Sequence, residues 1–307
     1  MEKISNKIKK FLNLPIVELI NIANNIRKEN IGNKLEFCNI LNAKSGLCSE
    51  DCKFCAQSKR YSTFSPVYPL KGIQEIVESA KYAKNIGAEK FGIVTSGRGV
   101  SKKEIKIIAS AIKEIKKSIG INVCASLGKI DKEDLSLLKE AGLVRYHHNI
   151  ETSKRFYKEI VSTHTFEERL ETIKNVREVG LEICSGGIIG LGENWFDRIE
   201  MANILKDLGV DSVPINFLVP IKGTPLDNRK PVSLEDAIRT ICIFRIILKD
   251  KIIKVAAGRE TTFFDAGVLI YMAGANGMLI GGYLTIKGRD LTDDYKLIRQ
   301  VNNLWNG

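Results

Sequence analysis

The sequence contains no apolar run near the roughly 18 residues that a membrane-spanning helix needs, so we do not expect a transmembrane protein. Its basic N-terminal segment is interrupted by Asn and Lys and has no small-residue cleavage site, which argues against export. Pro- or Ser-rich linkers, low-complexity segments and short repeats are also missing. Together these absences predict a cytoplasmic protein.

Aromatic residues are scarce, at 7% of 307 residues, although the formal net charge is +11. A nucleic-acid-binding protein usually gathers its basic residues on one face, with aromatic side chains available for stacking. Here Lys occurs in nearly every predicted helix and is mixed with Glu and Asp. The charge therefore favours solvated helix faces over nucleic-acid binding, with an anion-attracting surface as the alternative.

The other compositional features are those of a globular chain. A hydrophobic fraction of 44% and a charged fraction of 27% exclude disordered, collagen-like and coiled-coil proteins. The seven cysteines are odd in number and are not spaced like a small secreted disulfide framework. In a reducing compartment such cysteines are more often metal ligands or catalytic residues.

Hydrophobic periodicity alternates between a strand pattern and a helix pattern along the chain. Short β-rich runs lie at 35–41, 90–95, 120–126, 144–150, 181–189, 212–219, 252–258 and 277–281. Helical patterns lie at 15–29, 72–86, 102–118, 132–141, 166–180, 195–208 and 234–249. Eight strands alternating with helices over about 250 residues favour one (β/α)8 barrel of the TIM type over an open doubly wound sheet. We expect a helical extension over 1–34, the barrel over 35–285 and a C-terminal tail.

The connection from 42 to 70 is the one long irregular loop, and such loops in a compact domain are usually functional. It contains Cys48, Cys52 and Cys55 in a C-x3-C-x2-C spacing. Three thiolates on a short loop can bind three irons of a cubane cluster and leave the fourth iron open for a small molecule. A structural zinc site, which needs a fourth Cys or His, and a chance group of buried thiols are the alternatives.

This spacing, with Phe54 before the last cysteine, resembles the signature of the radical S-adenosylmethionine (SAM) enzymes. The flanking blocks resemble the biotin synthase family in the same order and with similar spacing over roughly residues 35–290. These blocks are NAKSGLCSEDCKFCAQSKRYST, YHHNIETS, ERLETI, CSGGIIGLGE, VPINFLVPIKGTPL and AGRE. Their combined length makes a chance match negligible.

The resemblance implies that Cys48, Cys52 and Cys55 hold a 4Fe-4S cluster whose open iron binds SAM. One electron then splits SAM into methionine and a 5′-deoxyadenosyl radical, which removes hydrogen atoms from unactivated carbons. In this family the substrate is dethiobiotin, which becomes biotin when one sulfur atom is inserted between two saturated carbons. Two SAM molecules are consumed for each product, and a second iron–sulfur cluster deep in the barrel supplies the sulfur.

The resemblance also assigns SAM contacts. Arg169 matches an arginine that clamps the SAM carboxylate, a role suited to a planar guanidinium. Asn149 and Glu151 fall where the family binds the ribose and the substrate. The block GGIIGLGE matches a strand at which small residues allow close approach to the adenosyl group. Its matching positions are Gly186, Ile188, Gly190 and Glu193.

The sequence departs from the family at the substrate site. The usual pattern is closer to N-H-N-L-D, so His147 replaces an Asn and Glu151 replaces an Asp. Substrate contacts are expected from His147, Asn149 and Asn216, the last matching a residue that binds the ring urea. We expect His148 to pack inside the barrel and His164 to lie at the surface where a helix begins.

For the second cluster the resemblance implies three cysteines and one arginine, and Cys124, Cys184 and Arg259 match three of these positions. The fourth position is Gly92, which offers no thiolate. Residues facing into a (β/α)8 barrel form layers drawn from alternate strands, so Cys38 on the first strand could replace the missing ligand. A shift of ligand would make the nuclearity of this cluster uncertain, either 2Fe-2S or larger. Cys38 as a core thiol is the alternative, and Cys242 is expected in the core.

Two other functions remain possible at this point. One is another radical SAM enzyme, a maturase or a mutase, although these do not generally combine Cys124, Cys184 and Arg259. The other is a non-enzymatic iron–sulfur redox sensor, for which a SAM site would be superfluous. The resemblance further implies a low-potential electron donor such as flavodoxin or ferredoxin and a homodimer, and the clusters imply an anaerobic host.

Overall fold

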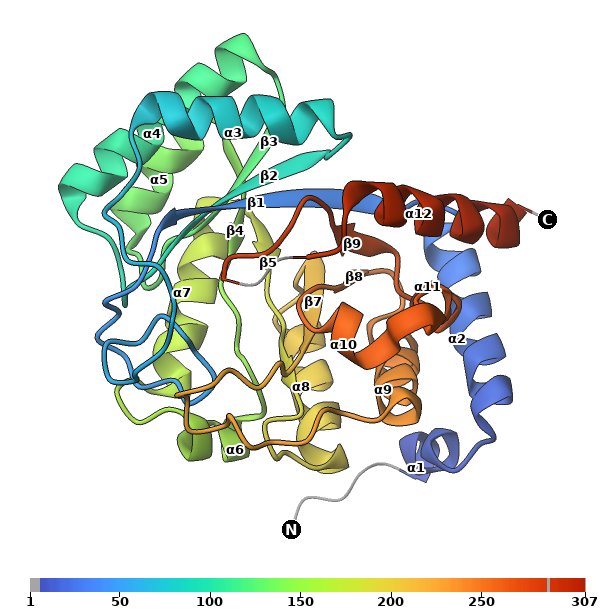
Figure 1. Ribbon diagram of the computed structural model, residues 1–307. Helices are drawn as coiled ribbons and strands as arrows, with labels where there is room; N and C mark the ends of the chain where they lie inside the picture. Colours follow the sequence, from blue (N-terminus) through green and yellow to red (C-terminus); the bar gives the residue numbers. More distant parts are fainter. Residues whose placement is uncertain (1–5, 286–287, 307) are drawn as a thin grey trace.

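The computed structural model describes residues 6–285 and 288–306, and its strands form one closed barrel (Figure 1). The order around the sheet is β5-β4-β3-β2-β1-β9-β8-β7-β6, with every pairing parallel, and β5 also pairs with β7. Because β5 and β6 are halves of one barrel strand, the sheet has eight strand positions. The predicted (β/α)8 fold is confirmed. The strands are β1 (Glu36–Lys44), β2 (Lys90–Thr95), β3 (Asn122–Ser126), β4 (Leu143–His147), β5 (Glu182–Cys184), β6 (Gly187–Ile189), β7 (Ser212–Phe217), β8 (Ile252–Val255) and β9 (Gly277–Leu279).

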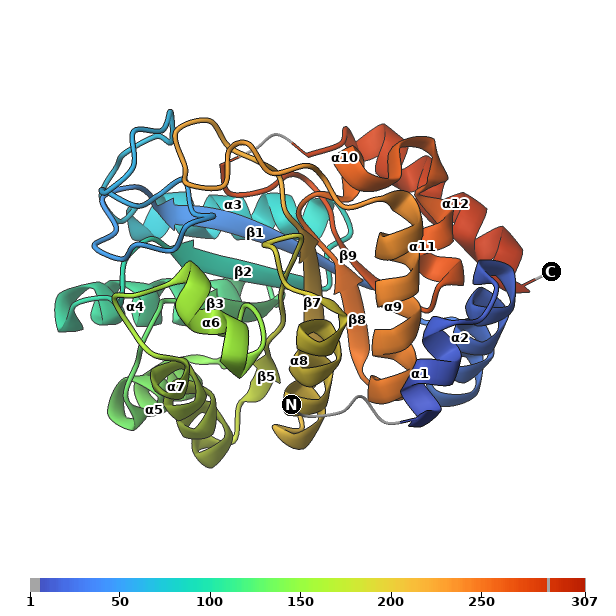
Figure 2. The same ribbon diagram turned by 90° about the horizontal axis from the view of Figure 1, so that it is seen from below.

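Helices cover the outside of the barrel between the strands (Figures 1 and 2). They are α3 (Ile73–Asn85), α4 (Lys102–Ser118), α5 (Lys132–Ala141), α6 (Lys154–Ile160), α7 (Phe166–Val179), α8 (Trp195–Asp207) and α9 (Leu234–Leu248). Side-chain caps determine several of their starts, since Ser101 and Thr165 each form a capping box with the Glu three residues later. The short α6, which starts at the cap Ser153, was not predicted because seven residues hold too little periodicity.

Successive side chains along each strand point alternately outward, into the apolar layer between sheet and helices, and inward, into the barrel interior. On β2, Phe91 and Ile93 are fully buried in the layer between sheet and helices. The alternate residues Lys90, Gly92 and Val94 line a cavity inside the barrel. This two-residue period places the chemistry inside the barrel and the apolar packing outside it.

The fifth barrel strand breaks at Ser185 and Gly186, between β5 and β6. A Cβ on Gly186 would collide with the carbonyl oxygen of Pro214, and one on Gly187 would collide with that of Glu151. Residues 186 and 187 must therefore be glycine for the neighbouring backbone to approach this closely.

The two ends of the described chain pack together beside the barrel (Figures 1 and 2). The predicted extension contains α1 (Asn6–Leu12) and α2 (Ile16–Ile31), and the predicted tail is the helix α12 (Leu291–Asn306). Arg27 of α2 stacks its guanidinium 3.8 Å from the ring centre of Trp305 of α12. Residues 1–5 of the extension and 286–287 and 307 of the tail lie outside the described residues. Between β8 and β9, where no helix was predicted, the chain forms α10 (Arg259–Phe263), a 3-10 turn (Phe264–Ala266) and α11 (Val268–Met272).

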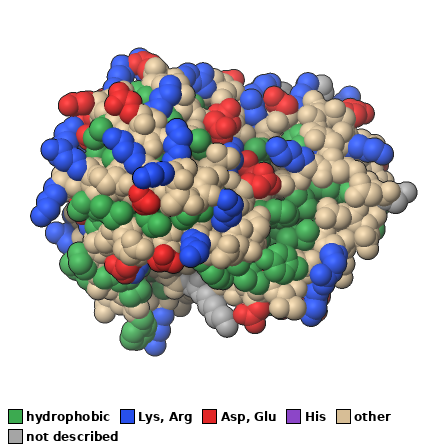
Figure 3. Space-filling view, turned by 90° about the horizontal axis from the view of Figure 1, so that it is seen from above, with side chains coloured by type: hydrophobic (Ala, Val, Ile, Leu, Met, Phe, Trp, Pro, Cys, Tyr) green, Lys and Arg blue, Asp and Glu red, His purple; other side chains and the backbone are tan. Residues whose placement is uncertain are grey.

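Basic side chains are spread over the face that carries α3, α4 and α12, where they alternate with acidic ones (Figure 3). This distribution agrees with solvated helix faces. Within residues 6–285 and 288–306, no helix combines the length and the apolar character required to cross a membrane.

Candidate active site

The loop between β1 and α3 holds Cys48, Cys52 and Cys55 at one opening of the barrel. Backbone hydrogen bonds fix its shape, with Cys48 N–H donating to Gln57 at 2.9 Å and Cys55 N–H donating to Cys52 at 2.9 Å. The Gln57 side-chain oxygen accepts from Gly46 N–H at 3.1 Å, which ties the loop to the end of β1. The loop is therefore a defined structure that presents three free thiols.

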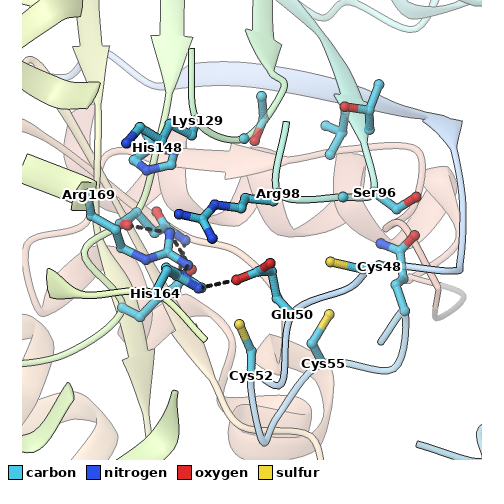
Figure 4. Close-up of a pocket in the computed structure, with 18 of the residues that line it drawn as sticks. Cys48, Glu50, Cys52, Cys55, Ser96, Arg98, Lys129, His148, His164 and Arg169 are labelled. Atoms are coloured by element: carbon cyan, nitrogen blue, oxygen red, sulfur yellow. Dashed lines mark hydrogen bonds and ion pairs between the residues drawn. The ribbon is translucent and has the colours of Figure 1, made fainter. Parts of the chain in front are cut away.

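These thiols are directed toward one space beside Glu50 and line the first cavity with Phe54 (Figure 4). Burial, together with a smaller effect of the charge on nearby Cys48, raises the pKa of the Cys55 thiol to about 11. Bound iron would instead hold each thiol as a thiolate. No group of three His, Cys, Asp or Glu in the described ranges is arranged to hold a single metal ion, whereas a cubane takes one thiolate for each of three irons. Three thiols facing a common space fit such a cluster.

Arg169, predicted to bind SAM, lies on α7 and lines the first cavity. Its side chain is 12% exposed, and its Nη1 donates to the carbonyl oxygen of Asn149 at 2.9 Å. The same nitrogen lies 3.7 Å from a carboxylate oxygen of Glu151, and Nε donates to the Tyr157 hydroxyl at 2.5 Å. The guanidinium is thus held at the cavity wall by contacts from three sides.

His164 is not the surface residue that we expected, because it lines the first cavity between Arg169 and Glu50 (Figure 4). Its Nε2 lies 3.0 Å from Arg169 Nη2, and its Nδ1 lies 2.5 Å from Glu50 Oε2. Since a guanidinium can only donate, Nε2 accepts and Nδ1 carries the proton that is donated to Glu50. Burial and the charge of Arg169 lower the pKa of His164, which keeps this neutral tautomer. Glu50 and His164 therefore connect the cysteine loop to Arg169.

His148 also lines the first cavity, where burial and the charge of Arg169 lower its pKa well below the usual value. It is packed inside the barrel, as predicted. Asn149 and Glu151, predicted to contact the ribose and the substrate, follow β4 and line the same cavity. Glu151 has a positive φ of 68°; its N–H donates to the Gly186 carbonyl at 3.1 Å, and its carbonyl accepts from Ile188 N–H at 2.9 Å. Its carboxylate lies 3.7 Å from Arg169 Nη1.

Four residues predicted to contact SAM differ from that expectation. Gly186, Ile188, Gly190 and Glu193 are not among the residues that line either cavity. The close approach at Gly186 is to the backbone of β7, and the Glu193 carboxylate accepts from Gly190 N–H at 3.0 Å and from Arg198 at 2.8 Å. These contacts shape the strand end behind the cavity wall.

A second cavity lies deeper in the barrel and contains three of the predicted cluster ligands, Cys38, Cys124 and Cys184. They come from the first, third and fifth barrel strands, as layered packing predicts. The residue that completes this layer from the seventh strand is Lys254, whose Nζ lies 2.9 Å from Cys38 Sγ. Gly92 lines the same cavity, and Cys242 is buried in α9, where it was expected.

Arg259, the fourth residue predicted to hold the second cluster, is not among the residues that line the cavity with these cysteines. It follows the end of β8, it is 2% exposed, and its Nη2 donates to Asp294 of α12 at 2.7 Å. The side chain therefore anchors the C-terminal helix to the barrel. The barrel interior faces Lys254 on the strand itself, whereas Arg259 begins the short helix α10 beyond it.

The floor of the second cavity carries a group of buried charges that the sequence analysis missed. The Glu36 carboxylate receives Lys254 Nζ at 2.6 Å and Arg145 Nη1 at 2.7 Å. Lys90 lies 3.9 Å from Glu36 and 3.6 Å from Glu182, which is half exposed. Burial raises the Glu36 pKa, but Lys254 and Arg145 outweigh it and lower that pKa to about 2. Three buried cations thus face one buried carboxylate. The sequence did carry a signal for these buried charges. Each lies on a predicted strand at a position that alternates with apolar core residues, and a charged residue there is unusual.

The three cysteines of the second cavity differ electrostatically. His147 Nδ1 lies 3.2 Å from Cys184 Sγ. Although burial raises the pKa of the Cys184 thiol, the charges of His147, Lys254 and Arg145 lower it to about 6. Burial raises the pKa of Cys124 to about 12. The surplus of positive charge fits an anionic, thiolate-bound cluster, because buried cations need compensating charge.

Asn216 lines the second cavity as predicted, but its amide is already engaged. Its Nδ2 donates to the Gly187 carbonyl at 3.2 Å, and its Oδ1 accepts from Ala257 N–H at 3.1 Å. The two cavities meet in the middle of the barrel, where both are lined by Val94, Ser126, His147, Asn149 and Leu284.

Comparison with known proteins identifies two family models along the chain. Residues 44–205 match the radical SAM superfamily, and residues 214–303 match the biotin and thiamin synthesis associated domain. The biotin synthase of Thermotoga petrophila is 52% identical over 97% of this chain and 99% of its own length. The biotin synthase of Clostridium perfringens is 46% identical over 95% and 91%.

Solved structures share the fold at low identity. Methylornithine synthase has a TM-score of 0.82 and 20% identity, covering 97% of this chain and 92% of its own. The hydrogenase maturase HydG has a TM-score of 0.78 and 17% identity, covering 95% and 69%. At such identity these two structures support the barrel alone. The relatives at about half identity support the biotin synthase interpretation over a maturase, a mutase or a redox sensor.

Proposed function

The chain belongs to the biotin synthase family, and we propose that it converts dethiobiotin to biotin by radical SAM sulfur insertion. The observation that carries this proposal is a pair of connected cavities with three cysteines in each. A sulfur-inserting enzyme needs a radical source and a sulfur source that reach the same substrate. The barrel provides one site for each and a shared space between them.

When bound, a 4Fe-4S cluster and SAM supply the hydrogen-abstracting radical, and a second iron–sulfur cluster supplies the sulfur atom. Cys48, Cys52 and Cys55 hold the first cluster. Arg169 binds the SAM carboxylate, because its guanidinium lies at the wall of the same cavity and carries a fixed charge. Glu151 accepts hydrogen bonds from the ribose, because its carboxylate lines the same cavity. Gly186, Ile188, Gly190 and Glu193 position this wall from behind.

For the second cluster we propose Cys38, Cys124 and Cys184 as ligands, with Lys254 in the position that we had assigned to Arg259. Contact between Lys254 and Cys38 at 2.9 Å and the common layer of all four side chains support this set. A cluster seated here lies against Lys90 and Arg145, whose charges compensate its own, whereas Lys254 would give up a proton to bind iron through Nζ. Its nuclearity is proposed to be 2Fe-2S or larger.

Dethiobiotin would lie where the cavities meet. His147 and Asn149 line both cavities, so they lie within reach of a molecule between the two clusters. Asn216 contributes from β7 at the wall of the second cavity, where its amide is held in one orientation by Gly187 and Ala257. Preorganised amide groups suit a cyclic urea, which both donates and accepts hydrogen bonds.

The test is an anaerobic assay with SAM, a chemical reductant and dethiobiotin, in which 5′-deoxyadenosine and biotin are both measured. Wild type should form both products. Cys52→Ala should form neither and keep the same far-UV circular dichroism, because the loop lies outside the barrel core. Normal 5′-deoxyadenosine formation by Cys52→Ala would refute the assignment of the first cluster.

Other expectations remain proposals as well. We propose a low-potential electron donor such as flavodoxin or ferredoxin, a homodimer, a cytoplasmic location and an anaerobic host. We also propose that the chain divides into an extension over 1–34, a barrel over 35–285 and a C-terminal segment. This segment was predicted as a tail, and it contains the helix α12.

A further inference from the structure

The segment that joins α6 to α7 is bound by several hydrogen bonds to the cysteine loop, which runs from β1 to α3. Lys53 N–H donates to the carbonyl oxygen of the last residue of α6 at 3.0 Å. The Asp51 carboxylate accepts from Ser162 N–H at 2.9 Å and from the Thr163 hydroxyl at 3.0 Å. The loop and this segment therefore form one unit, and the next residue, His164, lines the first cavity with the cysteines.

His164 uses both nitrogens of its ring within this unit (Figure 4). Nδ1 donates to Glu50 Oε2 at 2.5 Å, and Nε2 accepts from Arg169 Nη2 at 3.0 Å. The same carboxylate oxygen accepts from the Thr163 hydroxyl at 2.7 Å, and the Ser49 hydroxyl donates to the other oxygen at 3.0 Å. Glu50 is thereby fixed in place. Since successive hydrogen bonds polarise one another, its charge strengthens His164 as an acceptor for Arg169.

Contacts with the protein use part of the hydrogen-bonding capacity of the Arg169 guanidinium, which has five N–H donors. Within the described part of the chain, Nε donates to the Tyr157 hydroxyl, Nη1 to the Asn149 carbonyl and Nη2 to His164. One N–H group of each terminal nitrogen remains, since Glu151, at 3.7 Å from Nη1, lies beyond hydrogen-bond distance. Two such N–H groups can bind both oxygens of a carboxylate.

We propose that His164 is a positioning residue for SAM. It fixes the Arg169 guanidinium relative to the cysteine loop, so that the two remaining N–H groups meet the SAM carboxylate. The inference rests on the proposed function, in which SAM contacts both Arg169 and the cluster on the loop. A ligand held at two points binds well only when those points are placed to within about 0.5 Å. The contacts from Glu50 through His164 to Arg169 set this distance, because they begin on the loop and end at the guanidinium.

A purely structural role is the alternative, since the His164 ring also packs edge-on against Tyr157, with 5.9 Å between the ring centres. Two amide substitutions separate these roles. Asn places its amide where Nδ1 lies, so His164→Asn keeps the contact with Glu50 and loses the contact with Arg169. Gln places its amide where Nε2 lies, so His164→Gln keeps an acceptor for Arg169. Both variants lose the ring, so the packing against Tyr157 is removed equally in each.

The experiment measures the dissociation constant of SAM by calorimetry with the cluster-loaded protein and without a reductant, so that SAM binds but is not cleaved. Iron content is measured first, and the variants are compared at equal loading. We expect SAM binding to weaken by about tenfold or more in His164→Asn and by less than about threefold in His164→Gln. Equal weakening in the two variants would overturn the proposal, because the effect would then come from the lost ring. If His164→Asn takes up too little iron, His164→Leu replaces it, since Thr163 and Ser49 still donate to Glu50.

A double-mutant cycle tests whether His164 acts through Arg169. If it does, adding His164→Asn to Arg169→Ala should weaken SAM binding by less than about twofold beyond Arg169→Ala alone, because the guanidinium that His164 positions is already gone. A further loss as large as that of His164→Asn in the wild-type background would show that His164 acts independently of Arg169, and the positioning role would be refuted.

The outcomes also separate this inference from the proposed function. Unchanged SAM affinity in His164→Asn, together with weak binding in Arg169→Ala, would refute the positioning role alone. Wild-type affinity in Arg169→Ala would remove the carboxylate contact on which the inference rests and would overturn it. Wild-type protein that cleaves SAM but forms no biotin from dethiobiotin would refute the proposed function, whereas the role of His164 in SAM binding would stand.

Discussion

Replacing Lys254 by Met tests the ligand layer of the second cavity. Lys254 Nζ lies 2.6 Å from Glu36 and 2.9 Å from Cys38, and its side chain is 5% exposed. Breaking a buried ion pair costs about 3–5 kcal/mol when the partner charge is left alone. Here Arg145 still holds Glu36 through contacts of 2.7 and 3.2 Å. We therefore expect the free energy of unfolding to fall by only about 1.5–3 kcal/mol, the value of one charged hydrogen bond.

The matched variant is Arg259→Met. Arg259 donates to Asp294 at 2.7 Å, and both side chains are almost fully buried, at 2% and 1% exposure. Removing the guanidinium leaves the Asp294 carboxylate without its main partner, so the stability loss should reach about 3–5 kcal/mol. If Arg259→Met does not fold, Asp294→Asn is used instead, because it removes the same ion pair by neutralising the carboxylate.

The assay uses both substitutions in a background in which Cys48, Cys52 and Cys55 are Ala, so that only the second cluster remains. Iron, sulfide and Mössbauer spectra are measured anaerobically, and stability is measured by urea unfolding. We expect Lys254→Met to lose most of the remaining iron although it is the more stable variant. Arg259→Met should keep the iron. The opposite pattern would show that the layer argument is incorrect and that Arg259 is the ligand.

Four other predictions address single side chains. Arg169→Ala should weaken SAM binding by about 1.5–3 kcal/mol, and calorimetric isotherms that overlay the wild type would rule out a carboxylate clamp. In the metal-free protein, alkylation of Cys184 by iodoacetamide should rise with a midpoint near pH 6, because its thiolate forms above that pKa, while Cys124 should react only at much higher pH. His147→Gln should move the Cys184 midpoint upward, as followed by mass spectrometry, and an unchanged midpoint would contradict the electrostatic role of His147. Cys38→Ser should keep SAM cleavage but lose second-cluster iron and biotin formation, and full iron content would make Cys38 a core thiol.

Local sequence features determined much of this protein. The two hydrophobic periods predicted the barrel, since a strand or helix expresses its periodicity over a few consecutive residues. The loop cysteines were equally predictable, because Cys48, Cys52 and Cys55 lie within eight consecutive residues. Ligands so close in the chain meet whatever the rest of the fold does.

Only the tertiary structure decided which residues of different strands meet. Cys38 pairs in register with Leu279, whereas Lys254 pairs with Gly277, and this stagger brings Lys254 rather than Arg259 to the cysteines. His164 is a second example. Its position just before a helix predicted a surface residue, but the packing of α7 turns its side chain toward Glu50. The register between strands depends on the closure of the whole barrel, and no short stretch of sequence encodes it. The sequence by itself therefore determined the fold and the first set of cysteines, and the closed barrel decided the charges and partners that surround the second set.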